Sequence, residues 1–414
     1  MVNNNLINIK SPEVIDPLTE LLRSGARKLL EEAIQAELEE ALSAFEGETT
    51  SDGRNRVVRS GYQPEREILT GVGKVTVRVP KIRSREGNPE SFQSVLVPPY
   101  VRKSRSIESA IPWLYLRGVS TGQMQQALAT IVGPEAEGLS ASVVSRLKHK
   151  WKTEYVEWSR RRITGDWVYI WADGIYSHLR GDNGKLCCLV IIGVDSFGKK
   201  RFLAIEDGFR ESTQSWREVL LSLKSRGLTK APKLAIGDGA LGFFSALSEI
   251  YPETRHQRCQ MHKTSNVLNY MPSSLREKAK AALHDIWMAE DRTHAEKSFT
   301  DFLTRFSPKY PKATQCLEKD RQKLLCFYDF PAEHWCHIRT TNPIESSFST
   351  IRHRSRQTKG CLTRSTMLSM IFKLGQSAEG SWKKLRGFDQ LAKVIEGVKF
   401  KDGIEVKEEG RAAA

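Results

Sequence analysis

Two apolar stretches decide the fold: residues 167–176 read Trp-Val-Tyr-Ile-Trp-Ala-Asp-Gly-Ile-Tyr, and residues 185–194 read Lys-Leu-Cys-Cys-Leu-Val-Ile-Ile-Gly-Val. Aromatic and β-branched side chains are concentrated in both stretches, which is typical of strands. The turn Asp-Ser-Phe-Gly at 195–198 separates the second stretch from another apolar one at 200–205. We therefore expect strands over 167–172, 185–194 and 200–205, which form the antiparallel start of a sheet.

Helices and strands alternate after this start. Apolar residues recur at helical spacing over 212–225 and 241–251, and short strand-like stretches cover 233–237 and 254–260. Three strands followed by alternating helices and strands give the order of a ribonuclease H-like α/β core. Residues 271–340 carry helical patterns only. Because this segment is long for a loop, we expect an all-helical insertion in the core.

The N-terminal part has a different character. Residues 16–46 repeat leucine and alanine at helical spacing among acidic side chains, which predicts a helix that packs on its own domain or forms a dimer contact. Residues 51–103 contain 11 basic and 5 acidic residues and alternate around a Gly-Val-Gly turn, which predicts a basic β-hairpin and arm able to hold phosphates. Residues 104–152 predict three helices, of which the last, over 141–151, is short and basic. This pattern fits a helix-turn-helix, although small helical bundles look the same.

The predicted fold class is an α/β ribonuclease H-like catalytic core with an all-helical insertion, preceded by N-terminal helical and small β DNA-binding regions. The expected parts are an acidic helix over residues 1–50, a basic β-hairpin and arm over 51–103, a helix-turn-helix-like DNA-binding domain over 104–160, the first part of the core over 165–270, the helical insertion over 271–340, the last part of the core with basic helices over 341–400, and a tail over 401–414.

The charge of the chain indicates a polyanionic partner. The 414 residues, enough for two or three domains, include 64 Lys and Arg against 49 Asp and Glu, a net charge of +15. Residues 1–50 hold 4 basic and 10 acidic side chains, a net of −6, so the remainder carries +21. Nucleic acid is the commonest partner of so basic a chain. Seven irregularly spaced cysteines predict reduced thiols in a cytoplasmic protein, and no apolar run reaches the roughly 18 residues of a membrane span.

Two aspartates stand where a metal site is expected. Asp173 lies within an apolar strand, where a charge needs a cation or another polar partner, and Asp238 ends the stretch Leu-Ala-Ile-Gly. Ligand sites in open α/β sheets lie at the carboxyl ends of strands. Carboxylates on neighbouring strands are suitable ligands for Mg²⁺. The alternatives are a hydrogen-bonded strand residue for the first aspartate and a turn residue for the second.

Glu345 is a third candidate, with a competing explanation. In Asn342-Pro343-Ile344-Glu345, asparagine as N-cap, proline at the first position and glutamate at the third position would begin a helix. The glutamate would then accept a hydrogen bond from the N-cap backbone amide. Arginines follow Glu345 on the same helix face, which instead suits a metal site beside a phosphate chain.

The chain resembles a known family through four motifs. They are Trp-Ala-Asp-Gly around Asp173, Gly-Asp-Gly around Asp238, Cys-Gln-Met-His at 259–262 followed by Asn266, and Thr-Asn-Pro-Ile-Glu-Ser at 341–346, which continues to Thr-Lys-Gly-Cys at 358–361. The resemblance is to the Mutator-type bacterial insertion-sequence transposases, and it covers residues 52–400.

This resemblance implies a ribonuclease H-like nuclease whose Asp, Asp, Glu triad binds two divalent ions, Mg²⁺ or Mn²⁺. It also implies a helical insertion before the glutamate and binding to the terminal inverted repeats of the element. Asp173, Asp238 and Glu345 match the triad, as catalytic residues and as metal ligands.

Further residues are candidates for auxiliary roles. Cys259, His262 and Asn266 are expected beside the triad; a zinc site is the alternative for the cysteine and the histidine, but structural zinc needs four ligands. Trp287 and Trp335 are either core residues of the insertion or platforms on which an unpaired base stacks. The expected DNA-binding residues are Arg146, Lys148, Lys150, Arg352, Arg354, Arg356 and Lys359.

The function predicted from these observations is that of a transposase: metal-dependent cleavage and strand transfer of DNA at the terminal inverted repeats. The expected partners are double-stranded DNA, as element ends and as target, and a second copy of the chain. We expect a nucleoid-associated protein in the bacterial cytoplasm. The alternatives are a structure-specific endonuclease with the same fold and a DNA-binding relic without activity.

Overall fold

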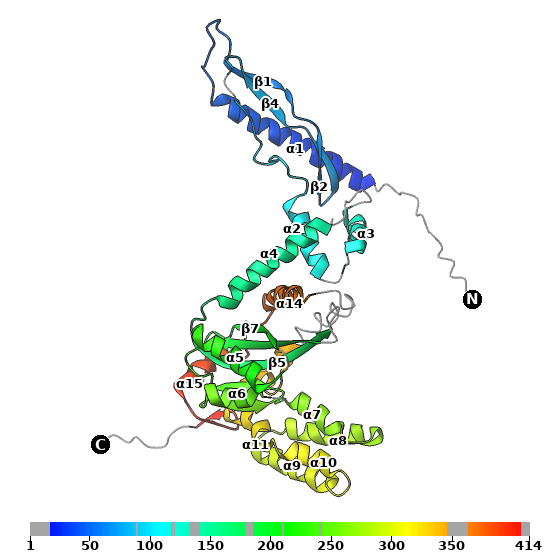
Figure 1. Cartoon of the computed structure of the whole chain (residues 1–414), viewed down its shortest axis with the longest axis vertical. Helices are drawn as coiled ribbons and strands as arrows, with labels where there is room; N and C mark the ends of the chain where they lie inside the picture. The colour runs from blue at the N-terminus through cyan, green and yellow to red at the C-terminus, as the bar shows by residue number, and fades with distance from the viewer. Residues whose placement is uncertain are drawn as a thin grey trace, which may run out of the picture. The chain divides into compact units, whose positions relative to one another are not determined.

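The structure is a computed structural model, and it describes residues 17–87, 90–116, 119, 121–132, 141–178, 185–208, 211–239, 242–345 and 363–406. The chain forms two compact units, Met1–Leu147 and Lys148–Ala414, which are described separately (Figure 1). The second unit contains the sheet and the candidate triad.

The first unit begins with one long helix, as its sequence predicts. Helix α1 (Pro17–Ser43) buries Ile34 and Leu38 against Val75 and Val77 of a small β-structure. The predicted hairpin is present as β2 (Arg66–Thr70) and β3 (Gly73–Val77), which pair antiparallel. A second antiparallel pair, β1 (Val57–Tyr62) and β4 (Pro80–Ser84), was not predicted. The helix therefore packs on its own domain, and a dimer contact stays a prediction.

Three helices complete this unit, and the third continues into the next unit. They are α2 (Arg105–Leu116), α3 (Thr121–Val132) and α4 (Ala141–Arg160). The prediction of a short last helix over 141–151 is wrong, because α4 has 20 residues. Its apolar face extends to Tyr155 and Trp158, whose rings contact Phe372 in the second unit.

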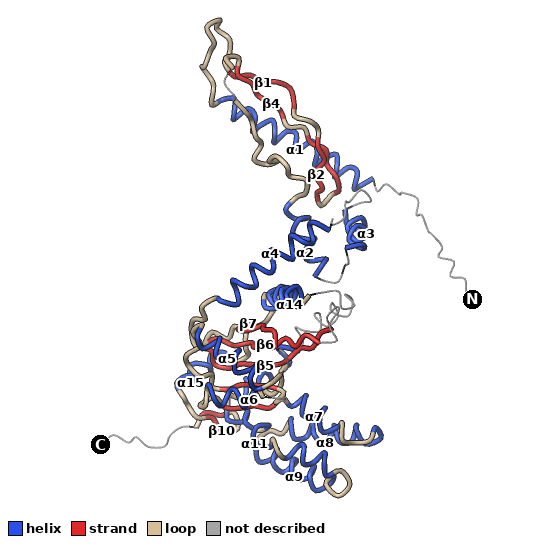
Figure 2. Tube along the Cα trace, in the orientation of Figure 1, coloured by secondary structure: helices blue, strands red, loops and turns tan. Residues whose placement is uncertain are grey.

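A five-stranded mixed sheet forms the centre of the second unit (Figure 2). Its order is β7-β6-β5-β8-β9; β6 is antiparallel to both β5 and β7, and β8 and β9 run parallel to β5. The strands are β5 (Trp167–His178), β6 (Lys185–Asp195), β7 (Lys200–Gly208), β8 (Leu234–Gly237) and β9 (Arg255–Arg258). The predicted strands and their antiparallel start are thus confirmed, with β5 and β7 longer than expected.

Both faces of the sheet are covered. On one face, α5 (Thr213–Ser225) and α6 (Phe243–Ile250) bury Trp216 and Leu247 against Ile170 and Ala172. On the other face, Tyr169 bonds the ring of His334 and Trp171 donates its indole N–H to the carbonyl of His337. Residues 169–172 therefore alternate between two buried faces, which explains why the strand is apolar along its whole length.

Every described element between β9 and residue 345 is a helix. They are α7 (Gln260–Leu268), α8 (Ser273–Trp287), α9 (Arg292–Phe306), α10 (Pro311–Glu318), α11 (Arg321–Leu324), the 3₁₀ helices η1 (Cys326–Asp329) and η2 (Ala332–His334), and α12 (Trp335–Ile338). Their apolar faces, with Leu283, Phe299 and Phe302 fully buried, form a core of their own.

The C-terminal part returns to the sheet. Helix α14 (Arg364–Glu379) contacts β7, and η3 (Phe388–Gln390) and α15 (Leu391–Glu396) follow. A short hairpin, β10 (Phe400–Lys401) and β11 (Ile404–Glu405), bonds the helical segment through Gly403, which pairs with Ala332 and Tyr328. The predicted tail therefore begins at least five residues later than 401. Among the described residues, no helix is long and apolar enough to cross a membrane.

Candidate active site

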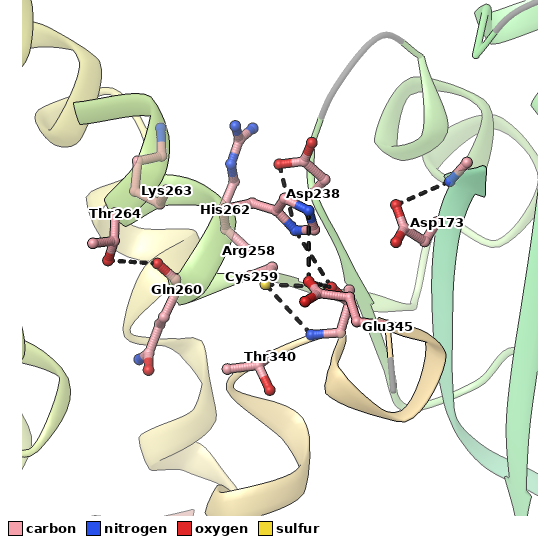
Figure 3. Close-up of polar contacts among 12 residues, drawn as sticks. Asp173, Asp238, Arg258, Cys259, Gln260, His262, Lys263, Thr264, Thr340 and Glu345 are labelled. Atoms are coloured by element: carbon pink, nitrogen blue, oxygen red, sulfur yellow. Dashed lines mark hydrogen bonds and ion pairs between the residues drawn. The ribbon is translucent and has the colours of Figure 1, made fainter. Parts of the chain in front are cut away.

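The sheet brings Asp173 and Asp238 to equivalent positions on adjacent strands. In the parallel pair β5 and β8, Ala172 lies opposite Gly237, and each aspartate is the next residue along its strand direction. Asp173 lies within β5, because this strand continues to His178, and Asp238 follows the last residue of β8. The prediction of two aspartates on neighbouring strands is therefore confirmed (Figure 3).

Asp173 is a buried carboxyl group with a strongly perturbed pKa. Its residue is 7% exposed, and Oδ1 accepts the backbone N–H of Gly174 at 2.9 Å. Its pKa is raised to about 7, chiefly by burial; the charge of His262 opposes this rise, and the charges of Glu211 and Asp238 contribute to it. A cation bound nearby would favour the ionised form.

Asp238 carries a buried oxygen that lies 3.8 Å from Nδ1 of His262 but has no hydrogen-bond partner among the described residues. Its Oδ1 is inaccessible to solvent and accepts no hydrogen bond from them, although the side chain as a whole is 24% exposed. The next residue, Gly239, has φ +66°, and a Cβ there would overlap the guanidinium of Arg258. An orphaned buried carboxylate oxygen requires an explanation, and a bound cation supplies one.

The helix that carries Glu345 begins one residue earlier than predicted. The carbonyl of Thr341 accepts the N–H of Glu345 at 3.1 Å, so Thr341 is the N-cap rather than Asn342. The N–H of Thr341 donates to Sγ of Cys259 at 3.4 Å, and the N–H of Asn342 donates to Thr340. The glutamate therefore accepts neither of these amides, and the capping explanation for it is wrong. Its Oε1 accepts instead the hydroxyl of Thr341 at 3.2 Å.

Cys259 and His262 connect these segments. The N–H of Cys259 donates to the carbonyl of Gly237 at 2.8 Å, and its sulfur accepts the N–H and the hydroxyl of Thr341. The imidazole of His262 lies between two carboxylates, 3.8 Å from Asp238 through Nδ1 and 3.6 Å from Glu345 through Nε2 (Figure 3).

The imidazole is a cation at neutral pH. Its hydrogen bond with Cys259 is the largest cause that raises the pKa of His262, and the carboxylates of Asp238 and Asp173 add to it, so that the value reaches about 9 although burial opposes the charge. One positive ring therefore stands among three acidic side chains, and the site as described has an excess of negative charge.

The described residues fit a hard, oxygen-binding cation such as Mg²⁺ better than they fit a zinc ion. Sγ of Cys259, the ring of His262 and the carboxylate of Glu345 lie within 4.8 Å of one another, but these are three ligands, and no fourth joins them among the described residues. The three acidic residues do not form such a tight group themselves, because the imidazole lies between two of them. The orphaned oxygen of Asp238 and the all-oxygen acidic set are appropriate for Mg²⁺ or Mn²⁺.

The sequence analysis missed two residues of this site. Thr341 is fully buried, and its hydroxyl lies 3.3 Å from Nδ1 of His262. Glu211, just before α5, is 9% exposed, and burial raises the pKa of its carboxyl group, with a further contribution from the charge of Asp238. Thr341 begins the motif at 341–346 but was given no role there, and no local pattern marks Glu211. Only the glycine after Asp173, which leaves room for the side chain of Glu211, hints at a close approach.

The remaining candidates are placed as follows. Asn266 is half-buried on α7, about one turn after His262. Trp287 is 7% exposed and donates its indole N–H to Thr264, and Trp335 donates its own to Phe330. Both tryptophans thus belong to the packing of the helical segment, which favours the core interpretation over base stacking.

The expected DNA-binding residues are described only in part. On α4, Arg146 and Lys150 are exposed and Lys148 is half-buried. Arg352, Arg354, Arg356 and Lys359 lie outside the described residues.

Comparison with known proteins agrees with this geometry. The family model described as "Transposase, Mutator family" matches residues 2–384. The chain belongs to the Mutator family of transposases. The transposase for insertion sequence element IST2 of Acidithiobacillus ferrooxidans is 50% identical over 282 residues, which is 68% of this chain and 95% of the relative. The transposase for IS6120 of Mycolicibacterium smegmatis is 44% identical over 298 residues, 72% of this chain and 92% of the relative.

The Mutator resemblance expected from the four motifs is thereby confirmed, and so is the prediction of an insertion-sequence transposase. A solved structure of the HTLV-2 integrase catalytic core in complex with magnesium shares 13% identity with the chain, covering 40% of it and 88% of the integrase core, with a TM-score of 0.18. This overlap is too small to establish a common fold.

Proposed function

We propose that this Mutator-family protein is a DDE transposase, which cleaves DNA at the ends of its element and transfers them to a new site by metal-dependent phosphoryl transfer. The observation that carries the proposal is the pairing of Asp173 and Asp238 on adjacent parallel strands, with Glu345 on the far side of one imidazole. The sheet order, three antiparallel strands followed by two parallel ones, supports a ribonuclease H-like core, in which the segment over 271–340 is a helical insertion before Glu345.

Asp173, Asp238 and Glu345 would hold two Mg²⁺ or Mn²⁺ ions, which when bound activate the attacking water or 3′-hydroxyl and stabilise the leaving oxygen. The chain's own groups orient this set. The sulfur of Cys259 holds Thr341 at the start of the helix that carries Glu345, and the same sulfur keeps a proton on the imidazole of His262. The imidazolium provides positive charge beside a scissile phosphate, and the β-strand register fixes the spacing of the aspartates.

The proposed substrates are double-stranded DNA, as terminal inverted repeats and as target, bound by a homodimer in the bacterial cytoplasm and nucleoid. The net charge of +21 beyond residue 50 supports a long DNA contact. The basic residues of α4 and of the segment over 346–362 are the proposed contacts with the phosphate backbone.

The proposal is tested with the DNA that flanks the gene. Wild-type protein with Mg²⁺ should cut a labelled duplex containing the end of the element and join it to a plasmid, and Asp238→Asn should bind the same duplex but not cut it. Cleavage of branched DNA without any strand transfer would identify a structure-specific endonuclease instead. Repeat binding without cleavage by the wild type, with either Mg²⁺ or Mn²⁺, would identify an inactive relic.

A further inference from the structure

Glu211 is a buried acidic residue that none of the four family motifs contains. It precedes Ser212, the N-cap of α5, and lies beside the strand that carries Asp173. The residue is 9% exposed. Its charge acts on Asp173, and the charge of Asp238 acts on it, so the three carboxyl groups are electrostatic neighbours.

The position of the Glu211 carboxyl group depends on a glycine. At Gly174, a Cβ would overlap Cδ, Oε1 and Cγ of Glu211, so the side chain of Glu211 lies directly over this backbone position. Gly174 has no need of a left-handed conformation, since it is an ordinary strand residue paired with Leu189. The absence of a side chain therefore serves the close approach of the carboxylate to the strand.

A second contact holds the carboxylate at this place. The hydroxyl of Tyr176, two residues further along β5, interacts with the carboxyl group of Glu211 and lowers its pKa, against the effect of burial. No lysine or arginine is paired with Glu211 among the described residues, although buried carboxylates are usually neutralised by such a partner. Among the described residues, the positive charge that acts on Glu211 is that of His262, while burial favours the neutral form of its carboxyl group.

Asp238 also has a carboxylate oxygen that no described donor satisfies. Oδ1 of Asp238 is buried and has no hydrogen-bond donor among the described residues. The group comprises Asp173, Glu211, Asp238 and Glu345, with His262 as the cation that lies between two of them. Acidic side chains thus outnumber the imidazolium four to one, and divalent cations bound among them would favour the ionised forms of Asp173 and Glu211, whose pKa values burial raises.

We propose that Glu211 is a fourth carboxylate of the metal site, where it helps to hold the divalent cation bound by Asp173 and Asp238. This inference rests on the proposed function, because it needs those two aspartates as metal ligands. Gly174 is then part of the site as well, since it provides the space through which the carboxylate reaches the cation.

The experiment is a calorimetric titration of the full-length protein with Mn²⁺ in the absence of DNA. Glu211→Gln should weaken Mn²⁺ binding by roughly tenfold or more, the usual effect of losing a residue that supports a metal site. Glu206→Gln is the matched control: Glu206 is a half-buried carboxyl group on β7 whose pKa burial also raises, but its charge acts on Arg226 rather than on Asp173. The Mn²⁺ affinity of Glu206→Gln should equal that of the wild type.

Gly174→Ala tests the same idea without a change of charge. The overlapping atoms are the end of a flexible side chain, so the new methyl group should displace the carboxylate of Glu211 and leave the strand in place. We expect a loss of Mn²⁺ affinity similar to that of Glu211→Gln, and no further loss when the two changes are combined. If Glu211→Gln fails to fold, as judged by circular dichroism, Gly174→Ala alone decides.

Asp173→Asn separates the two levels of the argument. If it binds Mn²⁺ like the wild type, the proposed metal site itself is wrong. If it loses binding while Glu211→Gln and Gly174→Ala both bind like the wild type, only the fourth carboxylate is refuted. Equal losses in Glu211→Gln and Glu206→Gln would also overturn the inference, because they would show a general effect of removing a buried charge.

Discussion

The substitution Glu345→Gln separates a metal ligand from a structural residue. The side chain of Glu345 makes two contacts: it accepts the hydroxyl of Thr341 at 3.2 Å, and it lies 3.6 Å from Nε2 of His262. Glutamine keeps an oxygen for the hydroxyl, so only the ion pair is lost. Both partners are about one third exposed, at 29% and 32%, so this pair contributes under about 1 kcal/mol in solution.

The free energy of unfolding of Glu345→Gln, measured by thermal unfolding in EDTA, should therefore differ from that of the wild type by less than about 1 kcal/mol. Cleavage of a labelled repeat duplex under single-turnover conditions with Mg²⁺ should fall at least roughly a hundredfold, which corresponds to about 2.7 kcal/mol of transition-state stabilisation. The expected loss of activity thus exceeds the expected loss of stability by a wide margin. Repeat binding should stay near the wild-type level or tighten slightly, because the substitution removes a negative charge from the proposed DNA-binding side.

Two comparisons make the result decisive. Glu318→Gln, an exposed residue at the end of α10, should cleave like the wild type. Because the cap amides bond Cys259 and Thr340, even Glu345→Ala should keep the helix start; it loses the Thr341 hydroxyl bond, worth about 1 kcal/mol, together with the same ion pair that Glu345→Gln loses. A Gln variant that cleaves within about threefold of the wild type would refute the reasoning, and the third metal ligand would then lie elsewhere in the chain.

Three further predictions concern the ionisable side chains of Asp173, His262 and Arg146. The pKa of Asp173 is raised to about 7 from 3.8, so the folded state holds a proton that the unfolded state has lost, and the stability of the metal-free protein should fall as pH rises from about 4 to 7. Asp173→Asn should remove this dependence of the unfolding free energy on pH, as measured by urea unfolding at several pH values. An unchanged dependence on pH in the variant would contradict the prediction. Cys259→Ala should lower the pKa of His262 from about 9 toward its ordinary 6.5, as followed by NMR of the ring protons, because the bond with the thiol is the largest cause of the shift; a pKa that stays near 9 would assign the shift to the carboxylates. Arg146→Ala, on the exposed side of α4, should weaken binding to all DNA sequences and reduce the salt slope by about one if Arg146 contacts phosphate. If Arg146 contacts a base, the substitution should cost roughly 1–3 kcal/mol of binding free energy on repeat DNA alone. Equal binding by the variant and the wild type would exclude Arg146 from the interface.

The sheet could be predicted from the sequence because its strands are apolar on both faces. Residues 185–194 contain a single charge at their start, and a run of this kind has few structures available other than a buried strand. Once the order of strands and helices is known, Asp173 and Asp238 become neighbours through topology alone. Local sequence was therefore sufficient for two members of the candidate triad.

The remainder of the site depends on contacts between distant residues. The helix at Glu345 begins at Thr341 rather than Asn342 because Sγ of Cys259, 82 residues earlier, accepts the N–H of Thr341. Glu211 enters the site because Gly174 leaves space for it, and neither residue shows this role in its own segment. Similarly, α4 extends beyond Trp151 because its later aromatic residues find partners on α14.

The role of His262 follows from the residues that surround its imidazole ring. The imidazolium lies between Asp238 and Glu345, where its charge separates two carboxylates that would otherwise repel each other. It depends on Cys259, and the same cysteine holds the N-cap of the helix with Glu345 and bonds the strand that ends before Asp238. One buried thiol thus fixes a cation and two acidic segments at once. Structural zinc needs a fourth ligand, which does not join Cys259, His262 and Glu345 among the described residues, and for this reason we assign the Cys-x-x-His motif to the organisation of the acidic residues rather than to a metal of its own.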